Sequence, residues 1–277
     1  MRDTFVPATG GQRLAGSVAL VVGAGQTPGE TIGNGRAMSV RFAQEGARVV
    51  AADRDLASAE ATVAMIIERV PEAEAVAVTL DVTDDDSVRA GVTAAVERFG
   101  SLDVVVNNVG IGSGDAGVTS ITDEAWDRIF DVNVAGARRV CRAVLPAMRE
   151  QGAGSIINIS SIASICAANL VAYKASKAAL NALTHTLASQ NARFGVRANA
   201  ILPGLMNTPM AIESISAARG VDRDDLIAAR DRQVPLAGGM GTAWDVANAA
   251  LFLASDEARF VSGVLLPVDG AQSARIG

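Results

Sequence analysis

Residues 18–37 have the sequence VALVVGAGQTPGETIGNGRA, an apolar run that passes directly into a glycine-rich turn. The run Val18–Val22 predicts a buried strand, and the spacing of apolar residues after it predicts a helix. Gly23, Gly25 and Gly33 allow the backbone to approach a phosphate closely. The N–H groups at the start of the helix, at Asn34, would then face its charge. The segment therefore predicts a strand–turn–helix unit that binds a dinucleotide.

An acidic residue, Asp53, directly follows the next apolar run, Arg48–Ala52. A carboxylate at the end of the second strand can accept hydrogen bonds from the adenosine ribose hydroxyls, and it repels a 2′-phosphate. This favours NAD over NADP as the cofactor. Two alternatives stay open: Arg54 could pair with a phosphate and favour NADP, and Asp53 could be a simple cap at the strand end.

Short apolar runs alternate with longer helical patterns along the rest of the chain. The predicted strands are Val18–Val22, Arg48–Ala52, Ala75–Leu80, Leu102–Val106, Ser155–Ile159, Arg197–Leu202 and Val264–Val268. The predicted helices are Asn34–Glu45, Asp55–Arg69, Asp84–Phe99, Thr122–Arg149, Ala172–Arg193 and Thr242–Ala254. The strands lack strict alternation, which is typical of strands covered on both faces. We therefore predict an α/β fold, a Rossmann-like doubly wound parallel sheet of about seven strands with helices on both faces.

The domain boundaries are expected near the N-terminus. Residues 1–14 are predicted to be a loose extension, and residues 15–277 a single domain. Residues 204–241 form the longest stretch without a predicted strand, which favours a lid over the substrate. Apolar side chains in this stretch suggest either an adaptable pocket wall or a lid that packs on itself: Met206, Met210, Ile212 and Ile215.

Composition excludes several classes of function. The 277 residues carry a net charge of −6 with a pI near 4.9, which is unlike a nucleic-acid-binding surface. No apolar run is long enough to cross a membrane, and the first residues lack the apolar core of a secretory signal. The two cysteines, Cys141 and Cys166, form no metal-binding pattern. We expect a cytoplasmic protein that binds neither nucleic acid, membrane nor metal.

The chain contains one tyrosine and two lysines, and all three lie within five residues: Tyr173, Lys174 and Lys177. Tyr173 and Lys177 are four residues apart on a predicted helix, so they share a face. A free phenol is a poor base at neutral pH, and a nearby ammonium favours the phenolate and lowers the phenol pKa. The spacing therefore predicts a proton-transfer site. The one histidine, His185, lies further along the same helix and is expected to be structural.

The chain resembles the short-chain dehydrogenase/reductase family from about Ser17 to Gly270. The matching segments, in order, are the Gly23–Gly35 turn, Asp81-Val82, Asn107-Asn108-Val109-Gly110, Asn133, Ser160-Ser161, Tyr173-x-x-x-Lys177 and Pro203-Gly204-x-x-x-Thr208. The resemblance implies hydride transfer between a secondary alcohol or ketone and a nicotinamide cofactor, in a homotetramer. It implies that Asp81 and Val82 lie against the adenine. It also implies further cofactor contacts at Asn108, Val109, Gly110, Pro203, Gly204, Met206 and Thr208.

By the same resemblance, Tyr173 is the acid/base and Lys177 its partner and ribose ligand. A serine orients the substrate oxygen. The family motif aligns Ser161 with this serine, whereas the usual spacing of thirteen residues to the tyrosine selects Ser160, and Ser164 is a further candidate. We choose Ser161. Asn133 resembles the asparagine whose backbone carbonyl completes a proton relay.

The first turn departs from the family pattern, because nine residues rather than three separate Gly23 from Gly33. This length resembles the enoyl-acyl-carrier-protein reductases, and it leaves open which residues of the loop contact phosphate. That branch, however, places its tyrosine and lysine seven residues apart, and here they are four apart. Two alternatives therefore remain beside an alcohol dehydrogenase: an enoyl-thioester reductase and a non-catalytic NAD-binding protein.

Overall fold

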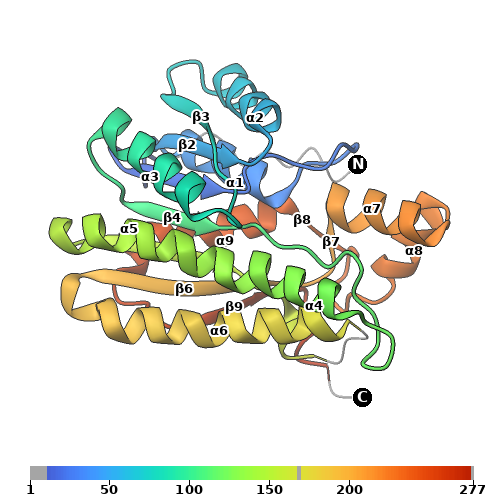
Figure 1. The fold of residues 1–277 in the computed structure, drawn as a ribbon. Coiled ribbons are helices and arrows are strands. Elements are labelled where there is room, and N and C mark those ends of the chain that lie inside the picture. Colours follow the sequence, from blue (N-terminus) through green and yellow to red (C-terminus); the bar gives the residue numbers. More distant parts are fainter. Residues whose placement is uncertain (1–10, 167–169, 276–277) are drawn as a thin grey trace.

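A computed structural model describes residues 11–166 and 170–275, and it confirms the predicted α/β class. The main sheet has seven parallel strands in the order β3-β2-β1-β4-β5-β6-β9 (Figure 1). The strands are β1 (Val18–Val22), β2 (Arg48–Asp53), β3 (Ala75–Thr79), β4 (Val104–Asn107), β5 (Gly154–Ile159), β6 (Val196–Pro203) and β9 (Leu265–Val268). All seven predicted strands are present, with ends that agree or differ by at most two residues.

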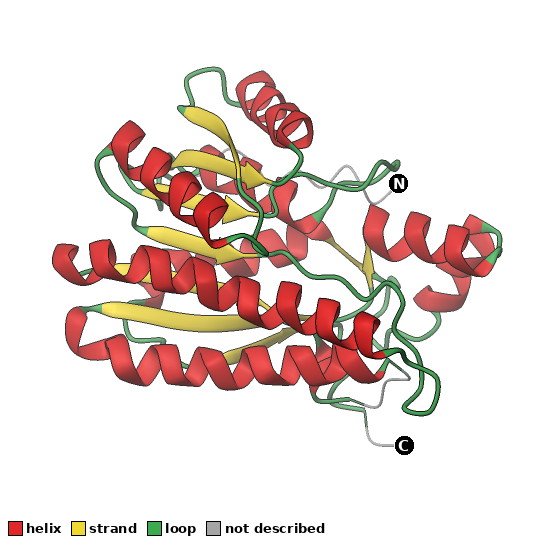
Figure 2. Cartoon of the chain, viewed as in Figure 1, coloured by secondary structure: helices red, strands yellow, loops and turns green. Residues whose placement is uncertain are grey.

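Helices cover both faces of this sheet (Figure 2). One face carries α1 (Asn34–Gln44), α2 (Leu56–Arg69) and α9 (Ala243–Ala254). The other carries α3 (Asp85–Phe99), α5 (Ala137–Gln151) and α6 (Val171–Asn191). This arrangement of a parallel sheet between two helical layers is the doubly wound fold.

The central strand β1 explains why the sequence of the sheet lacks alternation. Ala19 and Val21 belong to the core cluster on one face of the sheet, and Leu20 and Val22 belong to the cluster on the other. Side chains of a strand point alternately to the two faces. Because both faces are covered, every position of β1 is apolar and buried.

The helix predicted over Thr122–Arg149 is interrupted. It begins as expected at Thr122, whose hydroxyl oxygen accepts a 3.2 Å hydrogen bond from the N–H of Ala125. The helix α4 then spans Asp123–Phe130, and a π-helical turn, Asp131–Gly136, leads into α5. The wider turn contains Asn133, which is 0% exposed and uses its side-chain amide outside the helix, as described below. Single π-helical turns inside α-helices are frequent at functional sites.

The two segments expected to be least regular are partly ordered. Residues 1–10 of the predicted extension lie outside the described residues, but Leu14 is buried and its N–H donates to the Glu45 carbonyl oxygen. The packed chain therefore begins before residue 15. Residues 204–241 contain α7 (Pro209–Arg219) and α8 (Arg223–Asp231). The expectation of a strand-free stretch is wrong, because β7 (Met206–Asn207) pairs with β8 (Gly241–Thr242).

Candidate active site

The predicted site residues gather at the carboxyl ends of the parallel strands. Gly23 follows β1, Asp53 ends β2, Asn107 ends β4, Ser160 follows β5 and Pro203 ends β6. In Figure 1 this edge of the sheet faces α7, α8 and the start of α4. Ligands of doubly wound sheets bind outside the carboxyl ends of the strands. The topology therefore brings together segments that are far apart in the sequence.

The first turn needs glycine because backbone segments approach closely there. Gly23 has a φ of +83°, which side chains rarely tolerate. A Cβ on Gly35 would lie 1.9 Å from the Gly23 carbonyl oxygen, and a Cβ on Gly25 would lie 2.8 Å from Oδ2 of Asp53. The start of α1 can therefore pack directly against the end of β1. This is the close approach that a pyrophosphate site requires.

The long loop between Gly23 and Gly33 is held by Gln26. The Gln26 Oε1 atom accepts a 2.9 Å hydrogen bond from the Gly33 N–H, and its Nε2 donates to the Thr31 carbonyl oxygen. The Gln26 N–H in turn donates to the Ser58 hydroxyl oxygen on α2. One glutamine thus closes the insertion, a role the sequence pattern did not single out.

Asp53 lies beside this turn. Its Oδ2 accepts a 3.0 Å hydrogen bond from the Gly25 N–H, and its Oδ1 accepts from the Asp55 N–H. The Thr31 hydroxyl and the Asn34 side-chain oxygen are buried nearby and have no hydrogen-bond partner within the described residues. The turn combines close-packed glycines with unpartnered polar atoms, and the first turn of α1 has no acidic residue. These features fit the phosphates and ribose of a dinucleotide.

Asp81 and Val82, the residues expected around the adenine, lie just after β3. Asp81 accepts hydrogen bonds from the N–H and hydroxyl of Thr83, and these hold the pKa of the Asp81 carboxyl below its usual value. Val82 packs against Gly136, since a Cβ added to Gly136 would lie 2.8 Å from the Cβ of Val82. Asn108 donates a 2.8 Å hydrogen bond from Nδ2 to the Gly23 carbonyl oxygen.

Gly110 and Gly112 let the segment after β4 pack closely against α6. Val109, just before Gly110, packs over Gly23. A Cβ on Gly110 would lie 2.8 Å from Nζ of Lys177, and a Cβ on Gly112 would lie 3.3 Å from the Tyr173 ring. The segment after β4 therefore contacts both the first turn and α6.

Lys177 is 2% exposed, and its Nζ donates a 2.8 Å hydrogen bond to the Ile159 carbonyl oxygen at the end of β5. Burial lowers the pKa of the Lys177 ammonium to about 8. Burial raises the pKa of the Tyr173 phenol, and a hydrogen bond with the Ser161 hydroxyl offsets part of this rise. The sequence predicts a lowered Tyr173 pKa, but in the protein by itself this pKa is raised. Desolvation of the phenol outweighs the stabilisation of its anion.

Three serines were candidates, and their environments differ. Ser160 is 3% exposed and donates its hydroxyl to the Lys177 carbonyl oxygen, 3.1 Å away. Ser164 donates to the Ser161 carbonyl oxygen and accepts from Asn181. The Ser161 hydroxyl accepts a hydrogen bond from the Ala163 N–H, and its influence lowers the pKa of the Tyr173 phenol. Of the three serines, Ser161 is the one that affects the tyrosine pKa.

Asn133 links two parts of the site. Its Oδ1 accepts a 2.8 Å hydrogen bond from the Ile111 N–H, and its Nδ2 donates 2.9 Å to the Ile111 carbonyl oxygen. The same Nδ2 also donates to the Ser176 hydroxyl, which donates to the Tyr173 carbonyl oxygen. The buried amide therefore joins the loop after β4 to α6.

The segment after β6 packs against the C-terminal residues 268–272. The Gly204 N–H donates to the Val268 carbonyl oxygen, and an added Cβ on Gly204 would lie 2.4 Å from Oε1 of Gln272. Met206 and Thr208 are buried, at 5% and 6% exposure. Pro203, the last residue of β6, pairs with Val268 of β9. The C-terminal tail thus covers this end of the sheet.

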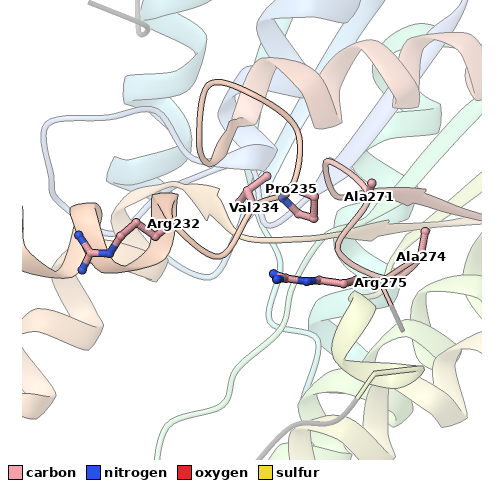
Figure 3. A pocket seen from close by; sticks show the side chains of 6 residues that line it. All are labelled: Arg232, Val234, Pro235, Ala271, Ala274 and Arg275. Atoms are coloured by element: carbon pink, nitrogen blue, oxygen red, sulfur yellow. The ribbon is translucent and has the colours of Figure 1, made fainter. Parts of the chain in front are cut away.

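A cavity of about 510 Å³ lies between residues 232–235 and this tail. It is lined by Arg232, Val234, Pro235, Ala271, Ala274 and Arg275 (Figure 3). The Leu236 N–H donates to the Gly270 carbonyl oxygen and ties the two walls together. In Figure 3 the Arg275 side chain extends below Pro235, whereas the Arg232 guanidinium points away from the tail.

An ion-pair network joins α7 and α8 to the long first loop. The Arg223 guanidinium on α8 pairs with Glu30 of that loop at 2.9 Å and with Glu213 of α7 at 3.2 Å. Of the apolar residues in the stretch 204–241, Ile212 is fully buried and Met210 is 51% exposed. Ile212 and Met206 therefore pack inside the protein.

His185 is exposed on α6. Within the described ranges, no three His, Cys, Asp or Glu side chains gather as a metal would require. In the same ranges, no helix has the length and apolar character needed to cross a bilayer.

Comparisons with known proteins identify the family of the chain. A family model described as "Enoyl-(Acyl carrier protein) reductase" matches residues 30–271. The 2-(R)-hydroxypropyl-CoM dehydrogenase of Xanthobacter autotrophicus is 40% identical over 93% of this chain and 98% of its own. The levodione reductase of Leifsonia aquatica is 35% identical over 99% of both chains. A crystal structure of a putative short-chain dehydrogenase/reductase from Burkholderia xenovorans has a TM-score of 0.88 and 43% identity, covering 96% of this chain and 99% of its own.

The chain belongs to the short-chain dehydrogenase/reductase family. It is an oxidoreductase that acts on CH–OH groups with a nicotinamide cofactor, and it interconverts an alcohol and a ketone. The enoyl-thioester alternative is not favoured, because the named relatives are dehydrogenases and reductases of this kind.

Proposed function

We propose that the protein is an NAD-dependent dehydrogenase of secondary alcohols in which Tyr173 exchanges the proton with the substrate oxygen. The observation that carries the proposal is the grouping of Tyr173 and Lys177 at the end of β5, with the Lys177 ammonium over the Tyr173 ring and bonded to the Ile159 carbonyl oxygen, and with Ser161 lowering the pKa of the phenol. When bound, the nicotinamide accepts or supplies the hydride. The four-residue spacing of Tyr173 and Lys177 supports this chemistry rather than enoyl reduction or cofactor binding alone.

The protein groups divide the proton chemistry among them. In alcohol oxidation, Tyr173 as phenolate takes the hydroxyl proton while the C–H bond yields the hydride, and the C–O bond becomes a carbonyl. Ser161 donates to the substrate oxygen and holds it beside the phenol. Lys177, as a buried cation, stabilises the phenolate and binds the nicotinamide ribose. Asn133 is proposed to complete the proton relay through its backbone carbonyl, while its side chain holds the loop after β4. Ketone reduction uses the same groups in reverse.

NAD rather than NADP is proposed because of Asp53. Its carboxylate borders the first turn, where it would accept hydrogen bonds from the adenosine ribose hydroxyls and repel a 2′-phosphate. The other proposed cofactor contacts are Gly23, Gly25, Gly33, Asn34, Asp81, Val82, Asn108, Val109, Gly110, Pro203, Gly204, Met206 and Thr208. If Arg54 bound a 2′-phosphate instead, NADPH would bind at least as tightly as NADH.

The proposed substrate is a small hydrophobic secondary alcohol or ketone, and residues 204–241 are proposed as the lid over it. The half-exposed Met210 and the cavity beside the C-terminal tail support this. The names of two relatives, a levodione reductase and a 2-(R)-hydroxypropyl-CoM dehydrogenase, are consistent with a substrate of modest size.

A homotetramer is proposed on the exposed aromatic residues near the C-terminus. Phe260 is 96% exposed and Phe252 is 36% exposed. Large apolar side chains that stand free on one chain are commonly covered in an assembly. Light scattering after size-exclusion chromatography tests the homotetramer, and a monomeric mass would contradict it.

The proposed location is the reducing cytoplasm. The two free thiols, Cys141 and Cys166, fit this location.

The test of the function is NADH formation from NAD across a panel of linear, cyclic and steroid secondary alcohols. We expect turnover with at least one member, and reduction of the matching ketone by NADH. An enoyl thioester is assayed in parallel. Oxidation of NADH by the enoyl thioester, with no turnover of any alcohol or ketone, would overturn the proposal.

A further inference from the structure

The start of α6, the helix that carries Tyr173, is capped from another part of the chain. The N-cap residue is Leu170, whose side chain cannot accept a hydrogen bond. The first N–H groups of a helix have no partner within the helix and need acceptors from elsewhere. Here the acceptor is Asp115, in the loop between β4 and α4. Asp115 lies 58 positions before Tyr173 in the sequence.

Both oxygens of the Asp115 carboxylate are used. Its Oδ2 accepts a 2.7 Å hydrogen bond from the N–H of Tyr173. Its Oδ1 accepts 3.1 Å from the N–H of Ala172 and 2.8 Å from the N–H of Ala116. A carboxylate at a helix N-terminus also interacts favourably with the helix dipole. The bond to Tyr173 is made by the backbone of that tyrosine itself.

The loop that carries Asp115 is fixed at its other end as well. Asn133 binds both backbone groups of Ile111. Between these anchors, Gly112 packs against the Tyr173 ring. Arg128 donates a 2.7 Å hydrogen bond to the Ser113 carbonyl oxygen and braces the middle of the loop. The loop is therefore a short brace between the segment Asn108–Gly110 and the first turn of α6.

We propose that Asp115 is a positioning residue: its carboxylate fixes the backbone of Tyr173 relative to the segment Asn108–Gly110, and so sets where the phenol stands in the cofactor and substrate site. The inference rests on the proposed role of Tyr173 as acid/base. Misplacement of a reacting group by about 1 Å lowers a rate by about a hundredfold. Loss of the brace should therefore reduce kcat more than cofactor binding.

The sole tyrosine makes the bond directly observable. Labelling the protein with [15N]tyrosine gives one backbone amide signal, from Tyr173. In Asp115→Ala this amide should exchange with solvent at least about tenfold faster than in the wild type, because its acceptor is gone. In Asp115→Asn exchange should be intermediate, since one amide oxygen can accept from Ala172 or Tyr173 but the NH₂ group cannot accept at all.

Turnover is measured on the same variants with the best alcohol of the panel, at saturating NAD. We expect kcat to fall by about tenfold or more in Asp115→Ala and by less in Asp115→Asn, with the dissociation constant of NADH within about twofold. The control is Asp84→Ala, which removes the cap of α3, a side chain that accepts from the Asp86 N–H. It should lower stability comparably and leave kcat within about twofold.

Unchanged amide exchange, or an unchanged kcat, in Asp115→Ala overturns the inference while leaving the proposed function in place. An equal loss of kcat in Asp84→Ala also overturns it, since the effect would then be general destabilisation. Full turnover in Tyr173→Phe overturns the proposed function instead, and the exchange of the Tyr173 amide still decides whether Asp115 holds it.

Discussion

The Lys177 ammonium lies over the face of the Tyr173 ring, with Nζ 5.7 Å from the ring centroid. One helical turn separates the two residues, and the hydrogen bond from Nζ to the Ile159 carbonyl oxygen fixes the lysine against the end of β5. The cation is therefore held beside the phenol by the sheet as well as by the helix.

Replacing Ser161 should separate its role from that of Ser160. Ser161→Ala removes the hydrogen bond that lowers the Tyr173 pKa, so the phenol should ionise at higher pH, and kcat should fall by about a hundredfold. The near-ultraviolet absorbance of tyrosinate reports this pKa directly, because Tyr173 is the only tyrosine. The control Ser160→Ala should destabilise the protein by about 1 kcal/mol and leave the Tyr173 pKa nearly unchanged. The reverse pattern would assign the role to Ser160.

Lys177 should make stability depend on pH in a predictable direction. Burial lowers its pKa to about 8 in the folded protein, below the 10.5 of an unperturbed lysine. Between these values the unfolded chain binds more protons, so the wild type should gain stability as the pH rises through this window. The shift corresponds to about 3 kcal/mol. Urea unfolding of wild type and Lys177→Met at several pH values measures it, and a constant difference between the two would contradict the prediction.

Asp53 should determine the preference between the two nicotinamide cofactors. In wild type, NADH should bind at least about tenfold more tightly than NADPH, because charged hydrogen bonds of this kind contribute about 1.5–3 kcal/mol. Asp53→Ala should weaken NADH binding and reduce the discrimination. Fluorescence titration measures both. If Arg54→Ala weakens NADPH binding and NADPH binds wild type as tightly as NADH, the alternative through Arg54 is correct.

Arg223 should affect substrate capture more than stability. Its ion pairs with Glu30 and Glu213 are partly exposed, and such pairs contribute about 1 kcal/mol or less. Arg223→Ala should therefore change Tm little, while KM for the alcohol rises severalfold because the lid is no longer tied to the first loop. Steady-state kinetics at low and high salt measure this. A KM equal to that of wild type at low salt would show that the network does not hold the lid.

The sequence predicted the parts of the site that depend on local spacing. The turn at Gly23 follows a buried strand, Asp53 ends the next one, and Tyr173 and Lys177 are one helical turn apart, so each could be placed without knowing the fold in detail. The choice between Ser160 and Ser161 remained open in the sequence, because one residue of loop length changes the side chain that reaches the phenol.

Other parts depend on contacts between distant residues and could not be predicted. The π-helical turn at Asn133 forms where that side chain binds Ile111, and Asp115 caps a helix that begins more than fifty positions later. Gln26 closes the long loop through Gly33 and Thr31, which no family pattern marks. The desolvation of Tyr173 was also missed, since burial of a phenol depends on the packed structure.

The most direct test of the account is Tyr173→Phe. The substitution removes one hydroxyl and keeps the ring that packs against Gly112 and Lys177. We expect kcat for the alcohol to fall by about a hundredfold or more, while the dissociation constant of NADH stays within about twofold of wild type. Turnover close to that of wild type in this variant would contradict the central claim that Tyr173 transfers the proton.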